Sequence, residues 1–325
     1  MRQEGRAGDP SPPRRSVRRG IPGGSRVTSV VAMLEIRELT RRFGDNTAVD
    51  HVSFEVPAGL MTGFVGGNGA GKTTTMRMMM GVLGIDEGEV LWHGRPITRL
   101  DRRRIGYMPE ERGLYPKQPI LDQLVYIAQL KGMDRVAART QVTELLERFG
   151  LGGRTRDHLE KLSLGNQQRV QIIASVLPRP AALVLDEPFS GLDPRAVDSM
   201  VDLLREYTRD GVPVLFSSHQ LDLVERLCDR LVVLAHGRRV AAGTVTELRD
   251  AGVPRFRLVL GGDAGWVRGL TGLDVLDLDG TTALVEVRTD GAEQPLIAEA
   301  TRRGDVHEFV RVRPALSEIY REATA

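Results

Sequence analysis

A glycine-rich stretch between residues 66 and 73 has the residue types and the spacing to bind phosphate. It reads GGNGAGKT and fits the pattern GxxxxGK[ST]. Glycines allow the backbone to turn its N–H groups inward around phosphate oxygens. Lys72 can reach the β- and γ-phosphates of a nucleotide, Thr73 can place its hydroxyl on Mg²⁺, and Thr74 is placed to bond the α-phosphate. The predicted phosphate-binding residues are Gly66, Gly67, Asn68, Gly69, Ala70, Gly71, Lys72, Thr73 and Thr74.

Two acidic residues and a histidine follow predicted strands, where the metal-binding and catalytic groups of a nucleotide site are expected. The apolar run ALVL predicts a short buried strand, and Asp186 and Glu187 follow it directly. Asp186 can hold a metal through water, and Glu187 can orient or deprotonate an attacking water. A solvated pair of acids is the alternative, which the matching phosphate loop disfavours. His219 follows the predicted strand VPVLFSS, at the edge where ligands bind parallel sheets, and we predict a catalytic role for it.

A second anion site, unlike the first, is predicted further along the chain. Residues 161–170 read KLSLGNQQRV, in which Ser163 and Gly165 precede a polar, helix-prone run. A helix that begins there leaves backbone N–H groups free to bind an anion. One chain therefore carries two dissimilar anion sites.

These chemical groups need elements to position them, and the pattern supplies strands and helices in alternation. The run MTGFV predicts a buried strand before the glycine-rich loop, and a methionine-rich helix follows the loop. Helical patterns dominate between Tyr115 and Ser163. After residue 254 the composition shifts to short strands, with helices near residues 292–304 and 314–325, which predicts a separate domain over 254–325.

Charge and composition restrict the function further. Residues 1–32 hold seven arginines against Glu4 and Asp9, about +5, so the net charge of +2 leaves about −3 for the remainder. The body of the chain is thus not a basic nucleic-acid binder, and we expect no nucleic-acid partner. Residues 1–32 are rich in Pro, Gly, Ser and Arg, which predicts a disordered basic tail. No stretch approaches the ~20 apolar residues that span a bilayer, so a membrane role would need another chain.

Together these motifs resemble the ATP-binding subunit of an ABC (ATP-binding cassette) transporter over residues 33–247. GGNGAGKT is similar to the Walker A motif, with Gly67 where proline is common. LVLDEP resembles Walker B, SGLDP the D-loop ending near Asp193, and SSH the H-loop. KLSLGNQQRV resembles the signature LSGGQ, and GYMPEERGLY the Q-loop region, with Glu110 where glutamine is usual. Phe43 stands where the family places an aromatic ring against adenine.

The resemblance implies a fold and a set of partners. The expected fold is α/β: a P-loop NTPase cassette with a mixed-sheet core and a helical subdomain at about 112–170, followed by a small α+β C-terminal domain. ATP and Mg²⁺ are the expected cofactors, with Thr73, Glu110 and Asp186 toward the metal. The family pairs two cassettes around two ATP molecules, so we expect a homodimer or a similar chain as partner. We also expect a membrane-spanning permease, which places the chain at the cytoplasmic face of the cell membrane, and an exporter rather than an importer.

Two functions other than a transporter ATPase fit the sequence less well. A cassette ATPase acting on ribosomes or DNA is disfavoured, because the chain has one cassette and no long coiled-coil insertion between Thr73 and Leu162. A nucleotide-binding regulator without turnover is disfavoured by Glu187, since a sensor has little use for a catalytic base. The resemblance implies that the specificity for the transported substrate lies mainly in the permease.

Overall fold

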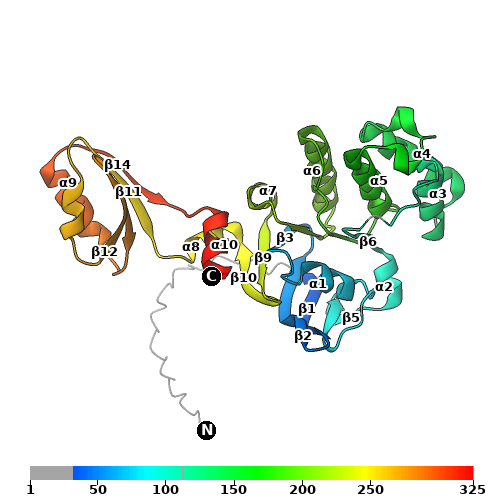
Figure 1. Cartoon of the computed structure of the whole chain (residues 1–325), viewed down its shortest axis with the longest axis horizontal. Coiled ribbons are helices and arrows are strands. Elements are labelled where there is room, and N and C mark those ends of the chain that lie inside the picture. Colours follow the sequence, from blue (N-terminus) through cyan, green and yellow to red (C-terminus); the bar gives the residue numbers. More distant parts are fainter. Residues whose placement is uncertain (1–31, 112, 325) are drawn as a thin grey trace, which may run out of the picture. The chain divides into compact units, whose positions relative to one another are not determined.

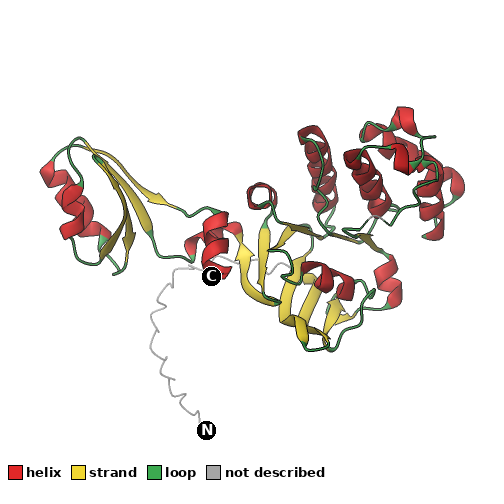
Figure 2. Cartoon of the chain, in the orientation of Figure 1, coloured by secondary structure: helices red, strands yellow, loops and turns green. Residues whose placement is uncertain are grey.

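The computed structural model describes residues 32–111 and 113–324 of the chain, in which strands and helices alternate (Figures 1 and 2). The predicted α/β class, with a mixed-sheet core and a further C-terminal α+β part, is confirmed. The predicted tail at residues 1–32 lies outside the described residues, except for Ala32, which begins the first strand.

A six-stranded sheet carries the predicted site, with the order β10–β9–β3–β8–β7–β6. Its pairs are parallel apart from β10 with β9. The strands are β3 (Met61–Gly66), β6 (Ile105–Met108), β7 (Ala182–Leu185), β8 (Val214–Ser218), β9 (Arg230–Ala235) and β10 (Arg238–Thr244). Side chains of β7 alternate between two hydrophobic cores, with Leu183 and Leu185 in one and Ala182 and Val184 in the other. The sheet is therefore buried on both faces, as its continuous apolar runs predict.

An antiparallel sheet, β2–β1–β4–β5, covers one of these cores. It comprises β1 (Ala32–Phe43), β2 (Asn46–Pro57), β4 (Glu87–Trp92) and β5 (Arg95–Pro96). Helix α1 (Lys72–Met79) contributes Met76, Met78 and Met79 to the same core, and α2 (Arg99–Arg103) follows β5. The methionine-rich stripe of α1 is thus core packing rather than a binding surface.

Helices cover the other face of the six-stranded sheet. The helical subdomain holds α3 (Ile120–Leu130), α4 (Arg135–Arg148) and α5 (Leu164–Val176). Beyond it come α6 (Pro194–Arg209), α7 (Leu221–Leu227) and α8 (Val245–Asp250). Figure 1 shows α3, α4 and α5 gathered together, and these three helices contact one another. Helix α6 lies beside α5, where the Tyr207 hydroxyl donates to the Val176 carbonyl oxygen. Helix α5 ends at Val176, so the helical part extends beyond the predicted limit of residue 170.

The C-terminal α+β part has its own antiparallel sheet, in the order β12–β13–β11–β14. Its elements are β11 (Arg255–Leu260), β12 (Leu273–Asp279), β13 (Thr282–Val287), α9 (Glu293–Arg303) and β14 (Val306–Val312). Leu296 and Ala300 of α9 pack on Leu258 and Val285 of the sheet in a separate hydrophobic core. A core of its own is what an independent domain requires.

The last helix, α10 (Leu316–Thr324), follows β14 and packs away from the C-terminal sheet. Leu316 is fully buried in the hydrophobic core on the helical side of the six-stranded sheet, and α10 contacts α7 and α8. The backbone N–H of Leu316 also donates to the Glu225 carboxylate of α7 at 3.3 Å. An amphipathic helix shows from sequence only that it has an apolar face, not which core that face joins.

Candidate nucleotide-binding site

The glycine-rich loop runs from the end of β3 to the start of α1, as predicted. Gly69 and Gly71 have φ angles of 75° and 101°, which glycine adopts readily and other residues do not. A Cβ at Gly66 would lie 2.7 Å from the Leu234 carbonyl oxygen, so a close approach to β9 requires glycine there. These constraints explain three of the glycines in the motif and shape a concave loop.

A cavity of about 410 Å³ opens beside this loop. Most of the predicted phosphate and metal residues line it, together with Glu187. The lining residues are Asn46, Ala48, Gly67, Asn68, Gly69, Ala70, Gly71, Lys72, Thr73, Thr74, Glu110, Asp186 and Glu187. Sequence reasoning missed Asn46 and Ala48, which carry no distinctive chemistry and reach the cavity only because β2 passes beside the loop.

The predicted phosphate-binding lysine is folded onto its own loop. Lys72 Nζ donates to the carbonyl oxygens of Gly66, at 2.7 Å, and Gly67, at 3.2 Å. The Lys72 side chain is buried at the start of α1, whose first backbone N–H groups have no partners within the helix. A positive charge, free N–H groups and a helix N-terminus therefore meet at one place that favours an anion.

Asp186 has one carboxylate oxygen without a partner. Its Oδ1 accepts a hydrogen bond from Ser217 Oγ at 2.6 Å, while Oδ2 is buried and, among the described residues, makes no hydrogen bond. A buried, unsatisfied carboxylate oxygen is costly unless another group binds it. This oxygen is available to a cation or to a water that a cation holds.

Two further side chains with oxygen atoms, Thr73 and Glu110, line the same cavity as this aspartate. The Thr73 hydroxyl donates to Glu110 Oε2 at 3.4 Å, which brings together two residues predicted for the metal. Within residues 32–111 and 113–324 no group of three or more His, Cys, Asp and Glu forms a metal cage. Mg²⁺ at nucleotide sites commonly uses one or two carboxylates and completes its shell with phosphate oxygens and water, so the donor set fits that ion.

The predicted base and the predicted catalytic histidine are hydrogen-bonded to each other. His219 Nδ1 lies 3.0 Å from Glu187 Oε2. Glu187 has a φ of 50°, in the left-handed region that glycine favours, and its backbone N–H donates to Ser217 Oγ at 2.8 Å. A left-handed conformation at a non-glycine residue persists only where its surroundings hold it, and it aims the Glu187 carboxylate at the cavity.

Two glutamines of α5 hold the turns that carry these acids. Gln168 Nε2 donates to the Glu187 carbonyl oxygen at 3.2 Å, and Gln171 Nε2 donates to the Pro109 carbonyl oxygen at 2.6 Å. Both glutamines are buried. Sequence reasoning missed these positioning residues, although two glutamines spaced i, i+3 on a helix offered a signal, since they share one face.

Ser163 and Gly165 stand outside the described cavity lining and form a second polar edge with the D-loop. Ser163 begins α5, and its hydroxyl accepts the backbone N–H of Asn166 at 3.4 Å, so the predicted helix start is where the structure places it. A Cβ on Gly165 would lie 2.8 Å from the Gly191 carbonyl oxygen, which explains the glycine. Neither Ser163 nor Gly165 is among the residues that line the cavity beside the phosphate-binding loop.

Asp193 caps the next helix instead of entering the cavity. Its Oδ1 accepts the Ala196 backbone N–H at 2.9 Å, and its Oδ2 pairs with Arg169 of α5 at 2.5 Å. The Ala196 N–H first, and the Arg169 guanidinium after it, hold the pKa of Asp193 below its usual value. Within this chain Asp193 therefore fixes the D-loop to the helix that begins at Ser163.

Phe43, predicted to stack on adenine, lies at the end of β1 with about half of its surface exposed. The Arg41 guanidinium carbon is 5.0 Å from the Phe43 ring centroid. Phe43 pairs in register with Asn46, which lines the cavity. The ring is thus beside the cavity and accessible, although it is not part of the described lining.

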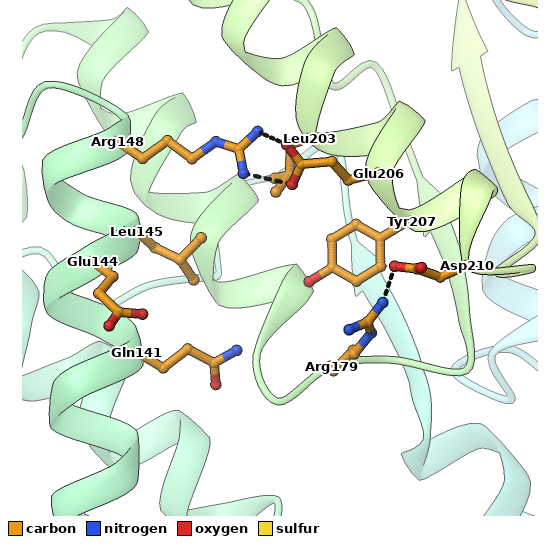
Figure 3. A pocket seen from close by; sticks show the side chains of 9 residues that line it. All are labelled: Gln141, Glu144, Leu145, Arg148, Arg179, Leu203, Glu206, Tyr207 and Asp210. Carbon is orange, nitrogen blue, oxygen red and sulfur yellow. Dashed lines mark hydrogen bonds and ion pairs between the residues drawn. The ribbon is translucent and has the colours of Figure 1, made fainter.

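A different cavity, of about 270 Å³, lies between α4 and α6, and Figure 3 shows its side chains. Arg148 of α4 makes a forked ion pair with Glu206 of α6, at 2.7 and 2.8 Å. The pair raises the pKa of Arg148 and lowers that of Glu206. This cavity holds none of the phosphate-binding residues, and its ion pair links the helical subdomain to a helix of the core.

The sequence of the chain matches two protein families and resembles known ATP-binding proteins. Residues 49–190 match the family described as "ABC transporter", and residues 243–324 match the C-terminal domain of DrrA1-3-like ATP-binding proteins. The chain is 39% identical over 291 residues to an uncharacterized ABC transporter ATP-binding protein, YhaQ, of Bacillus subtilis (strain 168), covering 89% of this chain and 98% of that protein. It is 32% identical over 296 residues to the Nod factor export ATP-binding protein I of Burkholderia pseudomallei (strain 1710b), and the alignment covers 90% of this chain and 94% of that protein.

A solved structure described as the ATP-binding subunit of an ABC transporter superposes with a TM-score of 0.63 at 31% identity, covering 67% of this chain and 92% of that one. The class of the fold is therefore the ABC cassette. The chain belongs to the ATP-binding proteins of ABC transporters, a family that binds and hydrolyses ATP. The matched C-terminal family begins at residue 243 and so includes α8 as well as the sheet.

Proposed function

We propose that the cavity beside the glycine-rich loop holds Mg²⁺–ATP, with residues 66–74 around the phosphates. The observation that carries this proposal is the convergence of Lys72, Thr73, Asp186 and Glu187 on one cavity. Lys72 would move from the Gly66 and Gly67 carbonyls to the β- and γ-phosphates. Thr73, Glu110 and the free Oδ2 of Asp186 would hold the ion, directly or through water, and Mg²⁺ bound there supplies positive charge to the phosphate oxygens.

Glu187 takes the proton of the attacking water in this proposal. Its carboxylate is 14% exposed and lines the cavity. Oε2 accepts a hydrogen bond from His219 Nδ1, so Oε1 remains for a water. His219, bonded to that carboxylate, orients it and contacts the γ-phosphate side of the site. Phe43 stacks on the adenine at the edge of the same cavity.

Ser163, Gly165 and Asp193 serve a nucleotide held by a second cassette. The N-terminus of α5, with the Ser163 hydroxyl and the Gly165 amide, is suited to an anion. Since these groups do not line the cavity that holds Lys72, a second chain is needed to bring them to an ATP. A homodimer, or a pair with a similar cassette, satisfies this requirement.

The chain works with a separate membrane-spanning permease, as an exporter on the cytoplasmic face of the membrane. No described helix, in 32–111 or in 113–324, is long and apolar enough to cross a membrane. Helices α3 and α4 expose Tyr126, Leu130 and Val136, a surface suited to a helix of such a partner. Relatives named for Nod factor export and for linearmycin resistance favour export.

The test begins with Lys72→Ala. Loss of the ammonium is expected to abolish measurable ATP binding and hydrolysis, whereas Lys131→Ala, remote from the cavity, is expected to change neither by more than about threefold. Wild type and variants would be compared by fluorescent-nucleotide binding and phosphate release. Normal hydrolysis by Lys72→Ala would contradict the proposed site.

The coupling to a permease needs a membrane assay. The polytopic membrane protein encoded beside this chain would be co-expressed, purified with it and reconstituted into vesicles. We expect the two proteins to copurify, the ATPase rate to rise in the complex, and Lys72→Ala to abolish ATP-dependent movement of substrate. An ATPase that ignores the membrane protein and instead responds to ribosomes or DNA would favour the alternative of a soluble cassette ATPase.

A further inference from the structure

Gly67 differs from the other glycines of the phosphate-binding loop, because the backbone does not require it. Gly69 and Gly71 have positive φ angles and Gly66 is crowded by a backbone carbonyl, but the φ of Gly67 lies outside the left-handed region. Among the described residues other than Gly67 and its two chain neighbours, one atom lies within 4 Å of a Cβ built on Gly67: the hydroxyl oxygen of Tyr320, at 3.3 Å. The side chain that limits this position comes from the far end of the chain.

Helix α10 is fixed in place beside the loop. Leu316 is fully buried in the cassette core, and its backbone N–H donates to the Glu225 carboxylate of α7. One turn further on, Tyr320 is half-buried and packs against the same core. Glu318 pairs with Arg255 of β11, whose side chain is 14% exposed, so the C-terminal domain also contacts this helix. These contacts leave α10 little freedom to retreat from Gly67.

The other side of Gly67 faces the phosphate-binding lysine. The Gly67 carbonyl oxygen accepts a hydrogen bond from Lys72 Nζ at 3.2 Å. Gly67 therefore contacts Lys72 through its carbonyl and approaches the Tyr320 hydroxyl at its Cα. A displacement of Gly67 by a few tenths of an ångström would move the carbonyl that holds the lysine.

We infer that the Tyr320 hydroxyl restricts position 67 of the phosphate-binding loop to glycine, because it occupies the space beside the Gly67 Cα. A methyl group at position 67 would lie 3.3 Å from that hydroxyl oxygen, so one of the two must shift by a few tenths of an ångström. Helix α10 thus packs behind the phosphate-binding loop of its own chain, and the pairing of Glu318 with Arg255 connects the C-terminal domain to this helix. The inference rests on the proposed role of residues 66–74 in holding ATP.

A double-mutant cycle with Gly67→Ala and Tyr320→Phe tests it. The alanine methyl crowds the hydroxyl, so Gly67→Ala alone is expected to weaken ATP binding about tenfold. Tyr320→Phe deletes the hydroxyl oxygen near position 67 and leaves Gly67 unchanged. This variant is therefore expected to bind ATP within about threefold of wild type. The double variant should bind ATP with about the same affinity as Tyr320→Phe. ATP affinity of the full-length chain would be measured with a fluorescent nucleotide, alongside KM and kcat of the complex with its membrane partner.

Ser317→Ala provides the matched control on the same helix and should not rescue Gly67→Ala. The inference would be overturned if Gly67→Ala weakened ATP binding equally in the single variant and in the double variant with Tyr320→Phe. It would also be overturned if Gly67→Ala alone bound ATP with wild-type affinity. If Gly67→Ala fails to fold, Tyr320→Trp replaces it in the test. The larger ring of tryptophan crowds Gly67 and is expected to weaken ATP binding about tenfold. Unchanged ATP affinity of Tyr320→Trp would also overturn the inference.

Lys72→Ala separates this inference from the proposed function. If Lys72→Ala binds ATP normally, the proposed ATP site itself is wrong. If Lys72→Ala loses binding while the effects of Gly67→Ala and Tyr320→Phe simply add, the ATP site stands and only the role of Tyr320 fails.

Discussion

Glu187 combines two features that suit a general base: a left-handed backbone and a carboxylate at the cavity wall. The amide of Glu187→Gln keeps the shape of the side chain but cannot accept a proton. We expect ATP affinity to stay within about threefold of wild type and hydrolysis to slow by at least ~10²-fold. Nucleotide binding and phosphate release would be measured on the same preparations, and near-normal turnover would exclude Glu187 as the base.

Glu110 replaces the glutamine that is usual in the Q-loop of this family. Either side chain offers an oxygen to a metal, and the Thr73 hydroxyl can donate to either. We expect Glu110→Gln to keep the rate of Mg²⁺–ATP hydrolysis within about tenfold, or roughly 1.4 kcal/mol of barrier. Steady-state hydrolysis over a range of Mg²⁺ concentrations would check this, and a thousandfold loss would show that the negative charge itself is essential.

At the scale of elements, the ion pair between Arg148 and Glu206 links α4 to α6 (Figure 3). Since both side chains are a third or more exposed, solvent screening limits the pair to under about 1 kcal/mol of stability. The pKa of Glu206 is lowered from 4.5, so the stabilisation is present above that pH and is lost as the pH falls through the lower pKa of the folded protein.

We therefore expect Glu206→Gln to lower the free energy of unfolding by less than about 1 kcal/mol at pH 7. The difference between the variant and wild type should shrink toward zero in acid, where Glu206 is protonated in wild type. Denaturant unfolding at a series of pH values would measure it. A difference that grows as the pH falls would contradict the assigned ion pair.

The sequence predicted elements that local patterns encode. The buried strand before Gly66, the strand before Asp186 and the helix that begins at Ser163 follow from apolar runs and start signals, and the structure confirms these elements. The sequence does not encode which hydrophobic core α10 joins, because the choice between two cores depends on tertiary packing.

In the site, too, local features were predicted and long-range contacts were not. The loop lysine and the two acids were predicted, since their chemistry and spacing are local. Tyr320 and the glutamines of α5 were missed, because each acts on a segment distant in sequence: Tyr320 on Gly67, and Gln171 on Pro109. No local pattern encodes a contact across that separation. The assigned roles of the site residues stay predictions until variants are measured.

For the whole molecule, the proposed ATP site is completed by a second cassette. Lys72 lines the cavity, whereas Ser163 and Gly165 do not. In a homodimer each ATP would then lie between Lys72 of one chain and Ser163 of the other. Two inactivating changes can separate these halves: Lys72→Ala removes the charge that grips phosphate, and Ser163→Arg fills the start of α5 with a bulky side chain.

Mixed dimers test this arrangement most directly. A dimer of Lys72→Ala with Ser163→Arg holds one site with both faults and one with neither if sites are shared, whereas wild type paired with the double variant holds two damaged sites. Differently tagged chains would be copurified, with the membrane partner where activity needs it, and their ATPase rates compared. The account predicts activity in the first pair and none in the second; activity in the second pair and none in the first would show that each chain completes its own site.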